Sequence, residues 1–569
     1  MTLAIRPRPY NALLQFWWEG TLAEKVDTFT RGISRRTALQ TTVLGAAAAA
    51  LGAQSSMALS PDDSGSVAVK PFALDEATIT DLQARMTSGE ISSEELTQAY
   101  LERINEIDKS GPTLNSVIEV NPDAAAIAAN LDKERKEERV RGPLHGIPVL
   151  INDNIDTADN MQTTAGSLAL VGSRPAQDSA GARKLREAGA VILGKTNLSE
   201  WANIRSSHST SGWSGRGGLT KNPYALDRNP CGSSSGSGAA TSANLCTVAV
   251  GSETDGSIVC PSSSNGIVGI KPTLGLMARA GIIPIAHSQD TAGPMARTVR
   301  DAAILLSALA GSDPRDPASG DADAKRQKDY TQFLVPDGLK GARLGIARKY
   351  LGFSDAVDAL INRLIEEMKS AGAAIVDPAD IETFGKFDDT ELTVLMYELK
   401  NDLNAYLAAR PDAQVKTLAD VIAFNEKNSA KELPYFGQDL FLKAQDKGPL
   451  TSKEYVDALA NNHTMAREKG IDAVMDKFHL DALVAPTGGP AWITDLVNGD
   501  HVGGGSSNAA AVAGYPNINV PAGFIFGLPV GISFFGRAWS EPTLLKIAYG
   551  FEQLVGARKA PQFLPEVKL

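Results

Sequence analysis

One stretch of small residues, from Cys231 to Thr273, constrains this chain more than any other part of its sequence. It reads CGSSSGSGAATSANLCTVAVGSETDGSIVCPSSSNGIVGIKPT. Glycine and serine at this density fill a core poorly, but they let the backbone approach a ligand closely and direct N–H groups at it. Two apolar runs inside the stretch, residues 245–250 and 267–270, predict buried strands and argue against a flexible linker. Such an arrangement suits the stabilisation of an oxyanion during acyl transfer.

Two serines stand 24 residues apart in this stretch, Ser233 in Cys-Gly-Ser-Ser-Ser-Gly-Ser and Ser257 in Glu-Thr-Asp-Gly-Ser-Ile. Their spacing and flanks resemble the motif of the amidase signature hydrolases, which use a Ser–cisSer–Lys trio. The resemblance implies that Ser257 is the nucleophile and that Ser233, after a cis peptide bond, is the proton bridge. It also implies an oxyanion hole made by the backbone N–H groups of Thr254, Asp255, Gly256 and Ser257, with Gly256 permitting the tight turn.

Further segments similar to this family follow in the expected order from about Leu74 to the C-terminus. The resemblance therefore implies one large α/β domain over residues 74–569, with a central mixed β-sheet covered by helices on both faces. Two segments, Glu253–Pro261 and Phe534–Glu541, are more similar to bacterial peptide amidases than to fatty-acid amide hydrolases. The other matching segments are Arg141–Ile151, Thr163–Ser167, Gly194–Trp201, His287–Pro294, Ala485–Thr487 and Gly514–Pro521.

One departure from the family pattern concerns the base. The family reads Gly-Ile-Pro-Val-x-x-Lys-Asp, whereas this chain reads Gly146-Ile-Pro-Val-Leu-Ile-Asn152-Asp153. A serine hydroxyl needs a base to take its proton, and an asparagine amide accepts none near neutral pH. Three interpretations stay open: an engineered or accidental substitution, a natural inactive homologue, or a natural enzyme that uses another base.

The leading functional prediction is hydrolysis of a carboxamide through an acyl-enzyme, with the C-terminal amide of a peptide as one candidate substrate. Because Asn152 stands in the lysine position, we expect low turnover. One alternative is a non-catalytic protein that binds amides or peptides on the same scaffold. A less favoured alternative is a component of a tRNA-dependent amidotransferase, which shares the family motif.

The N-terminal residues predict export. Ser34-Arg35-Arg36-Thr37-Ala38-Leu39 resembles the twin-arginine motif, a short alanine-rich apolar run follows, and Ser56-Met57-Ala58 offers a small-residue cleavage site. The apolar run is too short and too rich in alanine for a good membrane span. We therefore expect residues 1–58 to be a signal peptide and residues 59–73 a linker, and we expect a periplasmic or secreted protein without a stable membrane anchor.

The net charge, the cysteines and the histidines limit which partners and cofactors we expect this chain to bind. The net charge of −11 disfavours nucleic acid, and no Cys/His cluster has metal-ligand spacing, so we expect neither a metal nor another cofactor. Cys231, Cys246 and Cys260 give no full disulfide framework. Small buried fillers are the favoured interpretation, with Cys231 or Cys260 lining the site as the alternative. His145 and His287 are expected to be hydrogen-bonded structural residues rather than bases.

Periodicity predicts the outer elements. Apolar residues at helical spacing predict helices over residues 78–88 and 93–107, the second capped at its start near Ser92, and a third helix over 122–138. Strands are expected at 341–346 and 482–486. Residues 349–469 are expected to be largely helical and to cover the substrate cleft, or to form a helical layer with no ligand role.

Overall fold

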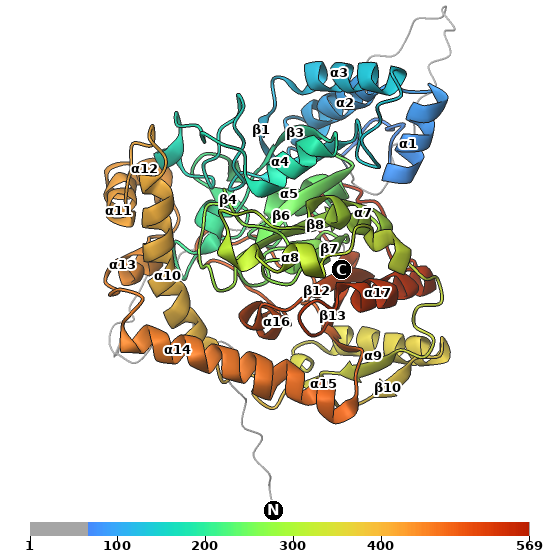
Figure 1. The fold of residues 1–569 in the computed structure, drawn as a ribbon, viewed down its shortest axis with the longest axis vertical. Coiled ribbons are helices and arrows are strands. Elements are labelled where there is room, and N and C mark those ends of the chain that lie inside the picture. Colours follow the sequence, from blue (N-terminus) through green and yellow to red (C-terminus); the bar gives the residue numbers. More distant parts are fainter. Residues whose placement is uncertain (1–66, 568–569) are drawn as a thin grey trace, which may run out of the picture. The chain divides into compact units, whose positions relative to one another are not determined.

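An eleven-stranded mixed sheet runs through residues 67–567, the part of the chain that this computed structural model describes (Figure 1). Its strand order is β1-β3-β2-β6-β8-β7-β12-β13-β11-β9-β10, with a separate two-stranded sheet of β4 and β5. The predicted α/β fold with a mixed central sheet flanked by helices is confirmed. The strands are β1 (Val117–Val120), β2 (Pro148–Asn152), β3 (Val191–Thr196), β4 (Trp213–Ser214), β5 (Gly218–Leu219), β6 (Val248–Glu253), β7 (Val268–Lys271), β8 (Thr291–Ala296), β9 (Arg343–Ile346), β10 (Ala374–Val376), β11 (Ala482–Pro486), β12 (Asn517–Ile525) and β13 (Leu528–Phe535).

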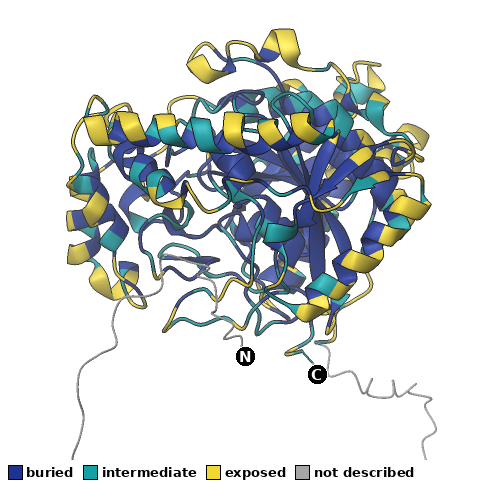
Figure 2. Cartoon of the chain, turned by 90° about the horizontal axis from the view of Figure 1, so that it is seen from below, coloured by how far each residue is buried: buried dark blue, intermediate teal, exposed yellow. Residues whose placement is uncertain are grey.

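The central strands are buried on both faces, which explains why they read as continuous apolar runs. Every residue of β2, β3, β6 and β8 is buried. Strand β2 pairs in parallel with both β3 and β6, and parallel strands need cover on each side. Figure 2 shows the result, with dark blue strands inside and yellow exposed turns on the outer helices.

The first helices begin where the sequence predicts. Thr78 caps α1 (Ile79–Ser88) and Ser92 caps α2 (Ser93–Arg103), each in a reciprocal capping box. Helix α3 (Ala124–Lys136) follows. The other α-helices outside residues 349–469 are α4 (Ala180–Glu187), α5 (Ser235–Ser242), α6 (Val259–Ser264), α7 (Val299–Leu309), α8 (Ala322–Lys325), α15 (Asp472–Phe478), α16 (Asn508–Ala513) and α17 (Glu541–Val555).

The predicted helical region over residues 349–469 is present. Its long helix α10 (Asp388–Ala408) packs Leu399 and Leu403 against Trp201, Ile283 and Ile285 of the core. This packing places α10 next to segments that carry the family motifs. The other helices of the region are α9 (Asp355–Ser370), α11 (Leu418–Lys427), α12 (Ser429–Glu432), α13 (Asp439–Gln445) and α14 (Lys453–His463).

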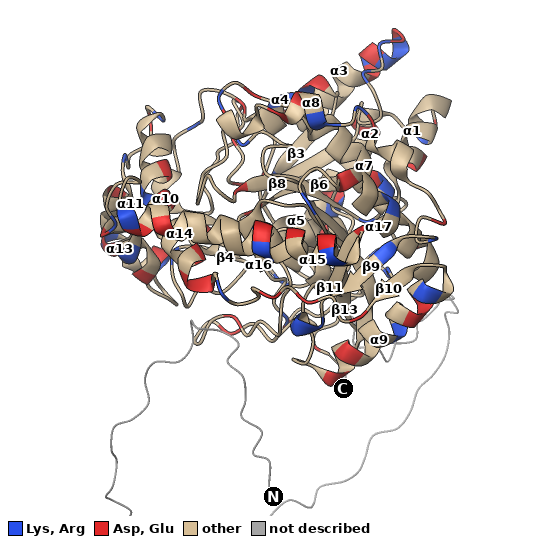
Figure 3. Cartoon of the chain, turned by 60° about the horizontal axis from the view of Figure 1, so that its bottom comes forward, with Lys and Arg blue, Asp and Glu red and all other residues tan. Residues whose placement is uncertain are grey.

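The predicted signal peptide, residues 1–58, and residues 59–66 of the predicted linker lie outside the described residues, so export stays a prediction. Within residues 67–567, no helix combines the length and the apolar character needed to cross a membrane. Both acidic and basic residues occur on outer helices such as α3, α9 and α13 (Figure 3).

Candidate active site

The candidate site lies at one edge of the sheet, where two neighbouring strands end. Strand β2 ends at Asn152 and strand β6 ends at Glu253, and the two strands run parallel with Ile151 opposite Val250. The carboxyl ends of parallel neighbours meet at one edge of a sheet, where α/β proteins place their ligands. Sheet topology therefore brings Asn152 next to the segment that leads to Ser257.

Ser233 lies between this edge and helix α5. The peptide bond between Gly232 and Ser233 is cis, as the family resemblance implies. The backbone N–H of Ser199 donates to Ser233 O at 3.0 Å, and the N–H of Ser234 donates to Ser257 O at 3.1 Å. The second bond joins the segments of the two serines through the backbone, and the first ties Ser233 to the segment of Ser199.

The oxyanion loop, defined here as Thr254–Ser257, connects β6 to α6. Gly256 has φ +77, a left-handed conformation that glycine adopts without steric cost. None of the four backbone N–H groups of the loop donates to another group among residues 67–567. Glu253 accepts from the N–H groups of Ile258 at 2.7 Å and Val259 at 3.1 Å, which fixes the far end of the loop. Unpaired N–H groups in a tight turn form an anion-binding concavity.

Asn152 is fully buried, and its amide is saturated with hydrogen bonds. Its Nδ2 donates to Ser234 Oγ at 2.9 Å and to Ser252 Oγ at 3.3 Å. Its Oδ1 accepts from Thr196 Oγ1 at 2.9 Å and from Ser237 Oγ at 2.6 Å. These five side chains are called the Asn152 pocket below. Every partner is a neutral hydroxyl, so the pocket holds a neutral side chain without an electrostatic penalty.

The two serine hydroxyls do not form a relay with Asn152. Ser233 Oγ is buried and makes no hydrogen bond to any described residue. Ser257 is 9% exposed, and its Oγ is not hydrogen-bonded to Ser233 within this part of the chain. Ser234 and Ser235 instead hold the loop, since their hydroxyls donate to Ser252 O at 2.9 Å and to Cys231 O at 2.6 Å.

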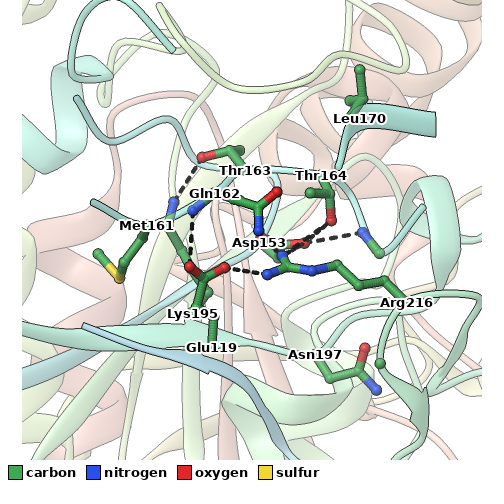
Figure 4. Close-up of polar contacts among 12 residues, drawn as sticks. Glu119, Asp153, Met161, Gln162, Thr163, Thr164, Leu170, Lys195, Asn197 and Arg216 are labelled. Atoms are coloured by element: carbon green, nitrogen blue, oxygen red, sulfur yellow. Dashed lines mark hydrogen bonds and ion pairs between the residues drawn. The ribbon is translucent and has the colours of Figure 1, made fainter. Parts of the chain in front are cut away.

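No other buried lysine of the described chain replaces the missing base. Burial lowers the pKa of both Lys195 and Lys271 to about 8. Lys195 Nζ donates to Thr163 Oγ1 at 2.9 Å and to Ile155 O (Figure 4), and Lys271 Nζ donates to Tyr515 O at 2.7 Å. Neither ammonium group hydrogen-bonds to Ser233 or Ser257, and both have partners elsewhere.

Asp153, next to Asn152, points into a separate ion-pair cluster with Arg216 and Glu119 (Figure 4). Its carboxylate also accepts from Thr164 Oγ1 and from the N–H of Gly166 at 3.2 Å. Burial raises the pKa of Asp153, and Arg216 acts in the opposite direction. Asp153 thus anchors the loop around residue 164 rather than the serines.

Both histidines from the matched segments are hydrogen-bonded away from the serines, as expected. His145 Nε2 lies 3.0 Å from Leu131 O. His287 Nδ1 lies 2.8 Å from Asp402 Oδ2, and this contact raises the pKa of His287. Neither ring contacts Ser233 or Ser257.

The prediction that the cysteines are unpaired fillers is wrong for two of the three. Cys231 and Cys260 form a disulfide with a Cα–Cα distance of 6.0 Å, while Cys246 is free and buried. The bond joins the Ser233 segment to the helix that follows the oxyanion loop. The odd number of cysteines gave no indication of this pair. Spacing along the chain does not show which two thiols the fold brings together.

Comparison with known proteins decides the family. The amidase family model matches residues 95–545. The chain belongs to the amidase family. Its fold matches the crystal structure of peptide amidase from Stenotrophomonas maltophilia with a TM-score of 0.82 and 51% identity, over 87% of this chain and 100% of that one.

Two relatives identified by sequence also match most of this chain. A probable amidase of Arabidopsis thaliana is 42% identical over 502 residues, which cover 87% of this chain and 93% of the relative. A component of the glutamyl-tRNA(Gln) amidotransferase of Chloroflexus aurantiacus is 34% identical over 495 residues, covering 84% and 97%. Family membership places this chain among the amide hydrolases.

Two small cavities adjoin the candidate site and extend it beyond the residues that the family motif predicts. One is lined by Ser233, Thr254 and Asn154 together with Ile283, and its neighbour is lined by Trp201, Ile283 and Leu399. The side chains lining the second cavity are apolar or aromatic, apart from that of Asn154. Sequence reasoning missed Leu399 because it lies in α10, where family motifs fade; the apolar run before His287 was the available signal for Ile283.

Proposed function

We propose that this chain is built to hydrolyse carboxamides, with Ser257 as nucleophile and Ser233 as proton bridge. The observation that carries the proposal is the oxyanion loop, whose four N–H groups are unpaired within the described chain and lie beside Ser257. The hydrogen bond from Ser234 N to Ser257 O, which holds the two serine segments together, supports the same assignment.

In the proposed reaction, Ser257 Oγ bonds to the carbonyl carbon and the carbonyl oxygen gains negative charge. The N–H groups of the oxyanion loop stabilise that charge in the transition state. The hydroxyl proton must pass through Ser233 to a base and then to the leaving amine. Asn152 accepts no proton near neutral pH, so no base receives the proton from Ser233 and turnover is low.

The Trp201 cavity shares Asn154 and Ile283 with the cavity that Ser233 lines, and its lining supports an apolar group near the scissile amide. Trp201, Ile283 and Leu399 offer no charge to pair with a charged side chain. This surface supports a peptide C-terminal amide whose apolar last residue lies against the lining rather than inside the cavity, which has room for about one water molecule. The likeness to a protein named peptide amidase supports the same substrate class.

The test is Asn152→Lys. We expect the substitution to raise kcat for a peptide amide by roughly 10² to 10⁴, the usual contribution of a general base. Ser257→Ala in the Asn152→Lys background is the matched control and should abolish the gain. Fast turnover by the unsubstituted chain, or no gain with Asn152→Lys, would show that Asn152 is not a lost base.

An amide-binding protein without turnover is the second candidate, favoured by the saturated hydrogen bonding of Asn152. Isothermal titration with a peptide amide distinguishes it. Tight binding without hydrolysis, unchanged by Asn152→Lys, would favour binding over catalysis.

A further inference from the structure

Helix α10 reaches the oxyanion loop through one buried carboxylate. Glu391 Oε1 accepts from Gln289 Nε2 at 2.8 Å, and Glu391 Oε2 accepts from Asn508 Nδ2 at 2.6 Å. Glu391 is 7% exposed and Gln289 is 2% exposed. One side chain of the helical region thus holds two amides that come from distant parts of the core.

The Gln289 amide also bonds to the oxyanion loop. Gln289 Nε2 donates to Thr254 O at 3.3 Å as well as to Glu391. Burial raises the pKa of Asp255, and the side chains of Ser507 and Asn508 beside its carboxylate act in the opposite direction. Glu391 therefore orients the Gln289 amide, which bonds to Thr254 O of the loop.

The opposite side of the loop is fixed independently. Thr254 Oγ1 donates to Asp290 Oδ1 at 2.6 Å, and Asp290 Oδ2 accepts from the N–H groups of Ile285 at 2.8 Å and Ala286 at 2.9 Å. A peptide group whose carbonyl is held has a fixed plane, which also sets the direction of the next N–H. The hydrogen bond from Gln289 to Thr254 O thereby aims the N–H of Asp255.

We propose that Glu391 is a positioning residue for the oxyanion hole, acting through Gln289. The proposal rests on the proposed function, because it assigns a role only if the loop binds an oxyanion. It gives the helical region a direct part in transition-state stabilisation in addition to covering the site. Small misalignment of preorganised donors is costly in catalysis.

The first experiment does not depend on the missing base. A peptide with a C-terminal aldehyde is compared with the matched alcohol by titration. Ser257 Oγ adds to the aldehyde carbon and the hydroxyl proton moves to the carbonyl oxygen, so the hemiacetal oxygen occupies the oxyanion hole. The alcohol cannot form this bond, and the ratio of the two dissociation constants therefore reports the loop.

Glu391→Gln should reduce the preference for the aldehyde about tenfold while leaving alcohol affinity unchanged, since one oxyanion-hole donor is worth roughly 10² or more in rate. Asp389→Asn, an exposed carboxylate on the same helix, is the matched control and should change neither affinity. Gln289→Leu serves as a second variant and should reproduce the loss. In the Asn152→Lys background, Glu391→Gln should lower kcat about tenfold with little change in KM.

The outcomes are distinguishable. If the unsubstituted chain binds the aldehyde no better than the alcohol, both the proposed function and this inference fail. If it prefers the aldehyde and neither Glu391→Gln nor Gln289→Leu alters that preference beyond Asp389→Asn, only the role of Glu391 is overturned.

Discussion

The oxyanion loop and the Asn152 pocket lie at the same edge of the sheet and differ in one respect. In the loop, the backbone N–H groups from Thr254 to Ser257 have no partner among residues 67–567. In the pocket, Nδ2 and Oδ1 of Asn152 each make two hydrogen bonds. One region is open to a ligand anion, and the other is closed around a neutral amide.

This difference separates two parts of catalysis that usually occur together. Stabilisation of negative charge needs only fixed dipoles, which the loop retains. Proton transfer needs a titratable group, which the pocket lacks. The chain should therefore bind species that resemble a tetrahedral intermediate even where it turns over substrate slowly.

The largest expected effect concerns the disulfide that braces the two serine segments. Cys260→Ala should lower the free energy of unfolding by about 3 kcal/mol, because the bond closes a loop across 29 residues. Chemical denaturation with and without a thiol reductant measures it. The unsubstituted protein should lose stability on reduction, and the variant should not respond; an equal response in both would contradict a structural disulfide.

Gly256→Ala should disrupt the conformation of the oxyanion loop and leave the Asn152 pocket unchanged. The left-handed φ of +77 penalises a side chain, and a Cβ there would lie 3.0 Å from Ser507 Oγ. We expect a loss of about 2 kcal/mol in unfolding free energy and most of the preference for a peptide aldehyde. Gly89→Ala, with the same φ of +77 and no atom within 4 Å of the added Cβ, is the control. It should cost about 1 kcal/mol and leave aldehyde binding unchanged.

The stability that Asp290 contributes beside the oxyanion loop should depend on pH, whereas the stability contributed by the neutral Asn152 pocket should not. Burial raises the pKa of Asp290 from 3.8 to about 6, so folding favours its protonated form. Its contribution to stability is complete below about pH 4 and is lost as pH rises through about 6. Asp290→Asn keeps an oxygen for the two backbone N–H groups, and Thr254 Oγ1 can accept from the new amide.

We therefore compare the free energy of unfolding of Asp290→Asn with that of the unsubstituted protein at two pH values. The difference between the two proteins should shift in favour of the variant by about 1–2 kcal/mol from pH 5 to pH 8. Urea denaturation at both pH values measures this difference. Parallel pH profiles for the two proteins would exclude Asp290 as the source of the dependence.

Ser237→Ala tests the pocket with the smallest expected effect. It removes the 2.6 Å donor to Asn152 Oδ1 but leaves Thr196 bonded to the same oxygen. We expect a loss of about 1 kcal/mol in unfolding free energy and unchanged affinity for a peptide aldehyde. A matching loss of aldehyde affinity would mean that the pocket and the loop act as one unit.

Much of the fold was predictable because its signals are local. Thr78 and Ser92 cap helices that start where the sequence predicts. The run 245–250 predicted a strand, but β6 starts only at Val248, after Leu245 and Cys246 in the preceding turn. Element boundaries depend on hydrogen bonds to neighbouring strands, which a single run of residues does not specify.

The sequence by itself determined the family, the register of Ser233 and Ser257, and the loss of a titratable group at position 152. These depend on residue identity and spacing, which are fixed before folding. The tertiary structure alone decided that Asn152 bonds to Ser237 and Ser252 rather than Ser233, that Cys231 pairs with Cys260, and that Glu391 holds Gln289. The physical reason is that hydrogen bonds and disulfides require atoms within a few ångströms, and only the folded chain brings residues so far apart in sequence to that distance.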